Sequence, residues 1–309
     1  MSKPQIDASL LGCYRELTGT LPFGKSGWRR HPWRTSDTCK TEWEQMMELT
    51  RTLWDEQDGV GIITLNRPER LNAIDVQTIA ELDYLVERSW NRESVRSLII
   101  TGAGRGFSAG ADVKEWAGPT GSESVEDSDG WALRMHRLMS RLYRIPKPVI
   151  AAVNGVAVGG GCDLTLVADF RIASTAARFG EVYIRVGFSP DAGGTFLLPR
   201  LIGPSRAAEL IYTGRIIDAH EADKIGLVNA LVAPEELMST AMEWATRLAS
   251  GPTVAIGLAK ELIRQNAELA FEDALRNERR AGQICGGTED HHEGLRATVE
   301  KRQANFKGR

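Results

Sequence analysis

The sequence predicts an α/β fold in which a layered core of strands and helices is followed by a helical region. Short β-branched runs alternate with helical patterns up to about residue 203, and strand signals nearly stop after it. The composition, 42% hydrophobic and 26% charged over 309 residues, is that of an ordinary globular chain. We therefore predict an N-terminal extension (1–52), a core (53–202) and a C-terminal helical region (203–309).

The core elements are predicted from periodicity. Apolar β-branched runs predict strands, which are Val60–Leu65, Leu98–Thr101, Val149–Val153 and Phe170–Ala173. Apolar residues at helical spacing predict helices over Val76–Ser89 and Trp131–Tyr143. The acidic Ser/Gly segment 118–130 is predicted to be a loop.

The C-terminal region is predicted to be helical apart from one short strand, Leu227–Val232. The predicted helices cover residues 204–213, 218–225, 234–250, 252–266, 269–284 and 288–303.

Composition also narrows the function classes. A net charge of −3 gives no basic field, so no nucleic-acid partner is expected. The four cysteines are too scattered for a metal site or a disulfide framework. No apolar run reaches the roughly 18 residues that span a bilayer, so no membrane association is expected. A cytoplasmic location is predicted, and arginines at 29, 30 and 34 leave the mitochondrial matrix open.

The strand Val149–Val153 leads into VAVGGGCDLTLVAD, with three glycines at 159–161. Each costs about 1 kcal/mol relative to alanine in a helix, so helix propensity does not explain them. Glycine allows close approach of a ligand, and the apolar pattern that resumes at once predicts a short buried helix. Its free N–H groups would face a developing negative charge, as in an oxyanion hole. A tight turn needed only for packing is the alternative.

A second glycine-rich segment, TGAGRGFSAGADVKEW, follows the strand Leu98–Thr101. It lacks the Gly-Lys-Ser/Thr of a phosphate-binding loop. Residues Gly106–Gly110 match the nucleophile-elbow pattern of serine hydrolases. That alternative is weak, because no helix follows the serine directly and no downstream histidine has the context of a catalytic base.

Taken together, FSAGADVKEW (107–116) and PVIAAVNGVAVGGGCDLTLVAD (148–169) resemble the enoyl-CoA hydratase/isomerase (crotonase) superfamily. The motifs NRPERLNAI (66–74), YTGRIIDAHEADKIGLVNALV (212–232) and VEKRQANFK (299–307) extend the resemblance to about residues 55–309.

The resemblance implies a spiral of ββα units forming two stacked sheets, followed by helices used for trimerisation. It also implies a homotrimer or a dimer of trimers, and an acyl-CoA thioester as substrate with no cofactor beyond its coenzyme A. The backbone N–H groups of Ala111 and Gly160 are the implied donors to the thioester carbonyl.

Coenzyme A carries phosphates, and the resemblance assigns cations to them. Arg70 is the main candidate, and Lys301, from the same chain or from a neighbouring subunit, is a second. The alternative for either residue is a solvated surface cation. The implied coenzyme A-binding segment also includes Ala109, Gly110, Asp112 and Val113.

The sequence departs from the hydratase pattern at its carboxylates. Hydratases of this family activate water with two glutamates, one directly after GGGC and one 20 positions later. Here these positions hold Asp163 and Tyr183. Tyrosine, with an ordinary pKa near 10, is a poor base at neutral pH. Glu181, two residues earlier, is a spare carboxylate that would revive the hydratase hypothesis if it entered the pocket.

A different carboxylate, Asp191 in SPDAGGT, stands where hydratases usually carry a small residue. Isomerases of this family, including dienoyl-CoA isomerases, use an aspartate there. Dienoyl-CoA isomerases also carry an aspartate at the position of Asp163, although they keep a glutamate where this chain has Tyr183. Both residues have simpler explanations, since Asp191 suits a turn and Asp163 suits a helix start.

The leading hypothesis is therefore an enoyl-CoA or dienoyl-CoA isomerase that uses Asp191 and Asp163. The alternatives are an enoyl-CoA hydratase or dehydratase with an unusual carboxylate pair, and an inactive thioester-binding or partner-binding protein.

Overall fold

A computed structural model describes residues 48–113 and 125–309. Most of the predicted N-terminal extension thus lies outside the described residues. The description below concerns the unit that spans residues 49–309.

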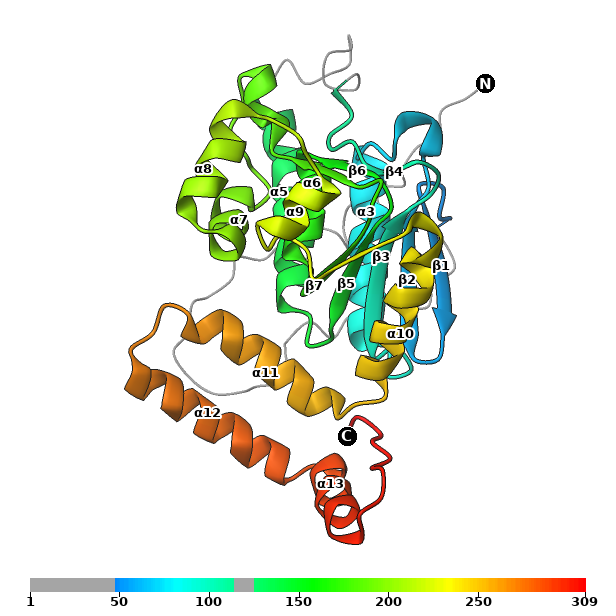
Figure 1. Cartoon of the computed structure of the whole chain (residues 1–309), viewed down its shortest axis with the longest axis vertical. Coiled ribbons are helices and arrows are strands. Elements are labelled where there is room, and N and C mark those ends of the chain that lie inside the picture. The colour runs from blue at the N-terminus through cyan, green and yellow to red at the C-terminus, as the bar shows by residue number, and fades with distance from the viewer. Residues whose placement is uncertain (1–47, 114–124) are drawn as a thin grey trace. The chain divides into compact units, whose positions relative to one another are not determined.

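Two sheets form the centre of the unit (Figure 1). The larger has the order β1-β2-β3-β5-β7-β10 and is parallel except for the antiparallel β1–β2 hairpin. Its strands are β1 (Thr52–Gln57), β2 (Val60–Leu65), β3 (Ser97–Gly102), β5 (Val149–Val153), β7 (Phe170–Ser174) and β10 (Ala230–Val232). The smaller has the order β4-β6-β8-β9, with only β9 antiparallel. Its strands are β4 (Gly106–Ser108), β6 (Val156–Val158), β8 (Arg178–Gly180) and β9 (Ile217–Asp218).

From β3 to β8, consecutive strands alternate between the two sheets, and this alternation produces the spiral. The chain passes from β3 to β4, from β5 to β6 and from β7 to β8, each time from the larger sheet to the smaller. Helical structure follows each pair: α5 (Val125–Arg144), α6 (Gly160–Val167), and the 3₁₀ turn η2 (Val182–Val186) with α7 (Gly194–Ile202). The predicted ββα spiral with two stacked sheets is confirmed.

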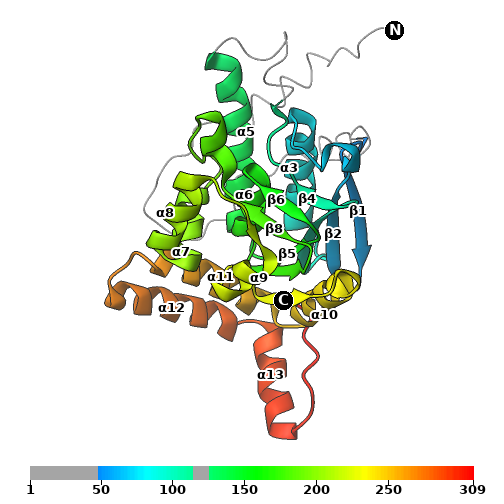
Figure 2. The ribbon, with the colours of Figure 1, turned by 45° about the horizontal axis from the view of Figure 1, so that its top comes forward.

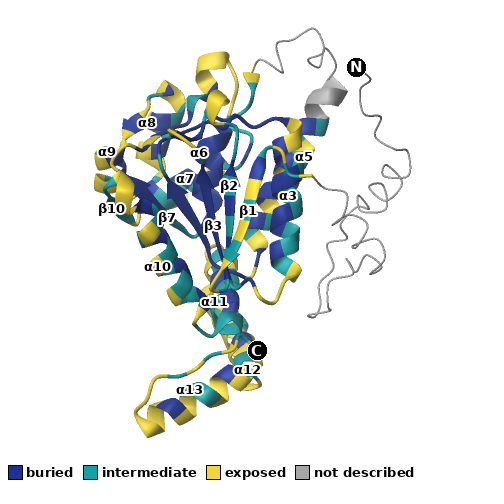
Figure 3. Ribbon diagram, turned by 90° about the vertical axis from the view of Figure 1, so that its right-hand side faces the viewer, coloured by how far each residue is buried: buried dark blue, intermediate teal, exposed yellow. Residues whose placement is uncertain are grey.

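Helices cover both faces of the larger sheet. On one side α3 (Val76–Asn91) and α5 pack against each other over the main apolar core. On the other, α10 (Leu237–Ala249) lies across β2, β3, β5 and β7. Figure 3 shows the buried central strands, such as β3, between these layers.

The C-terminal part is helical, as predicted. Besides α10 it contains α8 (Pro204–Thr213), α9 (Ala219–Lys224), α11 (Thr253–Asn266), α12 (Phe271–Gly286) and α13 (Glu289–Glu300). In Figures 1 and 2, α12 and α13 lie at the far end of the unit from α6. No helix in the two described ranges is long and apolar enough to cross a membrane.

The four predicted core strands are confirmed to within one residue at each end. The predicted loop 118–130 is wrong in its second part, because α5 already begins at Val125; residues 114–124 lie outside the described ranges. The strands of the smaller sheet escaped prediction because two or three residues are too few to display a period of two.

A buried carboxylate holds the start of β1 against α3. Glu81, in α3, is fully buried. It accepts hydrogen bonds of 2.8–3.1 Å from the N–H and hydroxyl of Thr50, the N–H of Arg51, and the N–H and hydroxyl of Thr52. Removing one partner of such a network leaves several buried donors unsatisfied.

The Glu81→Ala variant is therefore expected to lose on the order of 3 kcal/mol of unfolding free energy. Glu278→Ala, an exposed position on α12, is the matched control and should change it by less than about 0.5 kcal/mol. Urea titration measures both variants. Equal stabilities would contradict the anchoring role of Glu81.

Candidate active site

The first element of the site is the segment after β4. Ala111 forms an isolated parallel bridge with Ile74. Ile74 N–H donates to the carbonyl of Gly110 at 2.8 Å, and Asp112 N–H donates to the carbonyl of Ile74 at 3.0 Å. Because successive backbone groups of an extended segment point to opposite sides, the N–H of Ala111 is directed away from Ile74.

The second element is the start of α6. Gly160 is the first residue of this helix, so its N–H has no acceptor within the helix and lies at the positive end of the helix dipole. The preceding Gly159 has φ = 54° and ψ = −131°, a conformation that residues with a side chain rarely adopt. The predicted buried helix after the triple glycine is confirmed.

These two elements are in direct contact because glycines face each other. A Cβ at Gly110 would lie 2.6 Å from the carbonyl oxygen of Val158 and 3.2 Å from the nitrogen of Gly160. A Cβ at Gly161 would lie 2.4 Å from the carbonyl oxygen of Ser108. The N–H groups of Ala111 and Gly160 therefore lie in adjoining segments, an arrangement that suits two donors to one carbonyl oxygen.

Next to this pair is a buried carboxyl. Asp163, in the first turn of α6, is fully buried. The hydroxyl of Tyr183, from η2, donates to its Oδ2 at 2.5 Å. The same hydroxyl lies 3.7 Å from the position that a Cβ at Gly160 would occupy. Asp163 and Tyr183 therefore stand beside the candidate oxyanion hole.

Two more carboxyls surround this pair. Asp191 precedes α7 and interacts with the Tyr183 hydroxyl. The Nε2–H of His136, from α5, donates to the main-chain carbonyl of Asp191 at 2.6 Å. Glu181 is 1% exposed, and the Cβ position of Gly194 lies 2.6 Å from Asp163 Oδ1 and 3.0 Å from Glu181 Oε2.

Burial dominates the electrostatics of this cluster. Loss of solvation raises the pKa of Asp163 to about 7, although the hydrogen bond from Tyr183 opposes the rise. Burial, reinforced by the charge of Asp163, raises the pKa of Glu181 well above its ordinary value. Burial also raises the pKa of Asp191, and His136 opposes this shift. The pKa of Tyr183 is raised by burial and by Asp163, so its hydroxyl is a hydrogen-bond donor and not a base.

Comparison with known proteins decides the family. The family model described as enoyl-CoA hydratase/isomerase matches residues 55–309. The chain belongs to the enoyl-CoA hydratase/isomerase family. It is an enzyme of the hydratase/isomerase type.

Individual relatives support this membership. The short-chain-enoyl-CoA hydratase of Clostridium acetobutylicum is 40% identical over 265 residues, which cover 85% of this chain and all of that protein. The crotonyl-CoA hydratase of Syntrophomonas wolfei is 38% identical, with 84% of this chain and 99% of that protein covered. The crystal structure of an enoyl-CoA hydratase from Bacillus anthracis aligns with a TM-score of 0.80 and 38% identity, covering 84% of this chain and all of that one.

The implied coenzyme A-binding segment is only partly free to bind. Asp112 is paired with Arg67 at 2.9 Å, and Arg67 also reaches Asp75 at 3.1 Å. These ion pairs hold the segment Ala109–Asp112 against the chain around Ile74. Val113 is half-exposed.

Arg70 ends the exposed 3₁₀ turn η1 (Pro68–Arg70). Lys301 is the exposed left-handed C-cap of α13, a helix that packs mainly on α12. The structure does not bring Lys301 to the carboxyl cluster of its own chain. Its predicted contact with coenzyme A therefore requires a neighbouring subunit.

The serine-hydrolase alternative is not supported by the geometry. Ser108 is fully buried in β4, and its hydroxyl donates to the carbonyl of Asn72 at 2.8 Å. It also accepts from the N–H of Gly110 at 3.2 Å. The side chain therefore joins two backbone segments instead of standing on an exposed elbow.

Two members of the cluster had no firm place in it from the sequence alone. Glu181 is only a spare carboxylate in the sequence, and the structure places it beside Asp163. His136 is one of the downstream histidines without the context of a catalytic base, and its ring donates to the main-chain carbonyl of Asp191. Its position on α5 gave no signal, because the side chain is exposed and its partner lies 55 residues away.

The close packing of glycines can be tested with Gly161→Ala. Helix propensity alone would favour alanine by about 1 kcal/mol. The contact with the Ser108 carbonyl should outweigh this and cost about 2 kcal/mol or more of unfolding free energy. Gly282→Ala, where a Cβ would meet nothing within 4 Å, is the control and should stabilise the protein slightly. Thermal unfolding measures the stability of both variants relative to wild type. A Gly161→Ala protein as stable as wild type would refute the packing argument.

The buried Asp163 should make stability depend on pH. Its folded-state pKa, about 7, exceeds the ordinary 3.8. The stabilisation that protonated Asp163 contributes to the folded state is therefore complete below about pH 4 and is lost as the pH rises through about 7. The unfolding free energy of Asp163→Asn relative to wild type should therefore increase as the pH rises from 4 to 8, by at most about 4 kcal/mol. Urea titrations at both pH values test this, with exposed Glu278→Gln as control; a constant difference would contradict it.

Proposed function

We propose that the chain is an enoyl-CoA isomerase that moves a double bond within an acyl-CoA thioester. The observation that carries the proposal is Tyr183. It occupies the position of the second water-activating glutamate of the family's hydratases, and its hydroxyl donates to Asp163 at 2.5 Å. A tyrosine with a raised pKa cannot take a proton from water at neutral pH.

The proposed reaction begins with the thioester carbonyl bound by the N–H groups of Ala111 and Gly160. A carboxylate, Asp163 or Asp191, removes a proton from the carbon beside the carbonyl, and the electrons form an enolate stabilised by the two donors. A carboxylic acid of the same cluster returns a proton two carbons further along. A 3-enoyl thioester thereby becomes the conjugated 2-enoyl thioester, with no atom gained or lost.

The raised carboxyl pKa values support this assignment. A group that must accept and then return a proton near neutral pH works best when its pKa is close to the ambient pH. Asp163, with a pKa of about 7, meets this condition. The hydrogen bond from Tyr183 helps to keep the carboxylate available as a base.

An enoyl-CoA hydratase is the second candidate. The relatives from Clostridium acetobutylicum and Syntrophomonas wolfei are named hydratases, at 40% and 38% identity. In this version Asp163 and Glu181 would replace the two glutamates. Glu181, however, stands two residues before the position of the family's second glutamate, which Tyr183 occupies.

We further propose that the protein is a homotrimer or a dimer of trimers in the cytoplasm. Apolar side chains that are exposed on α11, α12 and α13, among them Ile263, Phe271 and Val299, support assembly through these helices.

The isomerase proposal is tested by following thioester conjugation by ultraviolet absorbance. Incubation with 3-enoyl-CoA thioesters should increase the absorbance of the conjugated product, whereas 2-enoyl-CoA thioesters should not lose theirs. Asp163→Asn and Asp191→Asn should each lower kcat by on the order of 10²-fold or more. Full activity of both variants, or hydration as the faster reaction, would overturn the assignment.

A further inference from the structure

Glu181 is a buried carboxyl to which the proposed mechanism gives no task. Its side chain extends from the loop between β8 and η2 and is 1% exposed. Neither of its oxygens accepts a hydrogen bond from a nitrogen or oxygen donor in the described part of the chain. An isolated buried carboxylate is costly, so this group requires an explanation.

The carboxyl oxygens that lack a hydrogen-bond partner lie near one another, beside Gly194. Glu181 Oε2 and Asp163 Oδ1 lie 3.0 and 2.6 Å from the point where a side chain of Gly194 would begin. Asp163 Oδ1 also lacks a hydrogen-bond partner among the described residues, although the N–H of Gly194 faces that carboxyl. Because two ionised carboxylates are both acceptors only, they can satisfy each other only when one of them carries a proton.

We propose that Glu181 is a positioning residue that shares one proton with Asp163, so that the two carboxyls act as a pair. Its role in catalysis rests on the function proposed above, with Asp163 as the carboxyl that faces the substrate. Glu181 carries the proton while Asp163 is ionised. The acid then donates to Asp163 Oδ1, while Tyr183 donates to Oδ2, so both oxygens of the base are held.

The charged and titratable neighbours of Glu181 favour this state on balance, although the hydrogen bond with the Cys162 thiol lowers the pKa of Glu181. From α6, the Cys162 thiol and Asp163 face Glu181. Tyr183 contacts the far side of Asp163, and Asp191 lies beyond Tyr183. The loss of solvation and the negative charge of Asp163 both favour the protonated form of Glu181 and raise its pKa.

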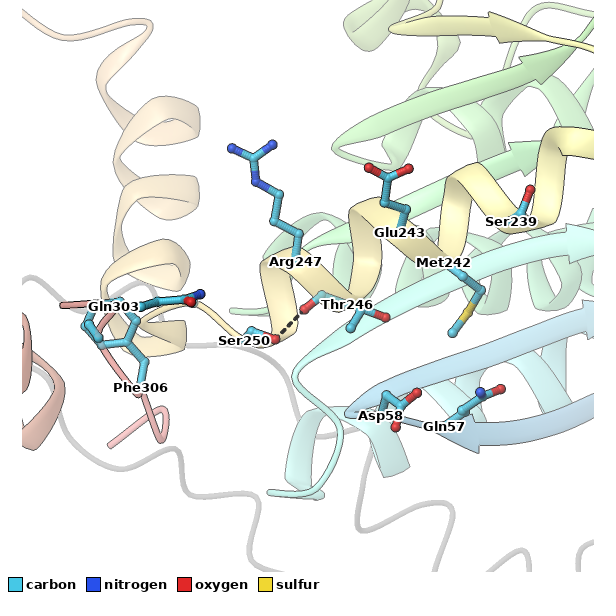
Figure 4. A pocket seen from close by; sticks show the side chains of 12 residues that line it. Gln57, Asp58, Ser239, Met242, Glu243, Thr246, Arg247, Ser250, Gln303 and Phe306 are labelled. Atoms are coloured by element: carbon cyan, nitrogen blue, oxygen red, sulfur yellow. Dashed lines mark hydrogen bonds between the residues drawn. The ribbon is translucent and has the colours of Figure 1, made fainter.

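The paired carboxyls can be observed directly by infrared spectroscopy, without substrate. At pH 7.5 the wild-type protein should show the C=O stretch of a protonated carboxylic acid, and Glu181→Gln should lose most of its intensity. Glu243→Gln is the control. It removes an exposed carboxylate on α10, beside a surface hollow formed with Asp58 and Phe306 (Figure 4), and should leave the band unchanged.

A second variant keeps the test informative if Glu181→Gln folds poorly. In Asp163→Asn the neighbouring charge is gone, so the titration midpoint of the Glu181 band should fall by about one pH unit or more. A band of undiminished intensity in Glu181→Gln, or a titration midpoint that Asp163→Asn leaves unchanged, would overturn the proposed pair. Since these spectra involve no turnover, they remain decisive even if the isomerase assignment fails.

Discussion

The site depends on the close contact between the start of α6 and the segment that follows β4. At Gly110 and Gly161 a single Cβ would come within 2.6 Å of a backbone oxygen of the opposite segment. Without side chains at these two positions, the N–H groups of Ala111 and Gly160 lie in adjoining segments. The same contact places Asp163, one turn into the helix, beside the carbonyl that those groups would bind.

The spiral provides the two segments at the required place. β4 and β6 are parallel neighbours in the smaller sheet, so their carboxyl ends lie at the same end of that sheet. The segment after β4 pairs with Ile74, while β6 leads directly into α6. The ion pairs of Arg67 with Asp75 and Asp112 then hold the first segment against the start of α3. The fold thus positions the donors through backbone contacts that do not depend on the substrate.

Burial of acidic groups next to these donors is costly for stability. Each unit of pKa shift corresponds to about 1.4 kcal/mol of preference for the neutral form, and Asp163 and Glu181 are both shifted upward. Stability alone would favour apolar residues at these positions. The cluster is therefore better explained by proton transfer, for which a carboxyl with a pKa near neutrality is required.

Much of the fold and of the candidate site was predictable from the sequence. The remainder could not be predicted, and the reasons are physical. The long strands and helices have clear periods, and the triple glycine indicated α6 and its free N–H groups. The spacing of 20 residues indicated Tyr183, but its hydrogen bond to Asp163 and the approach of Gly194 arise from three-dimensional packing. Asp112 was assigned to coenzyme A, and its pairing with Arg67, 45 residues away, has no local signal.

The central claim is that this cluster moves protons without adding water. Its most direct test is mass spectrometry of the acyl-CoA product formed from a 3-enoyl-CoA thioester in water enriched in heavy oxygen. The account predicts a product of unchanged composition, with the double bond moved into conjugation and no heavy oxygen incorporated. A main product heavier by one water molecule and carrying the isotope would contradict it.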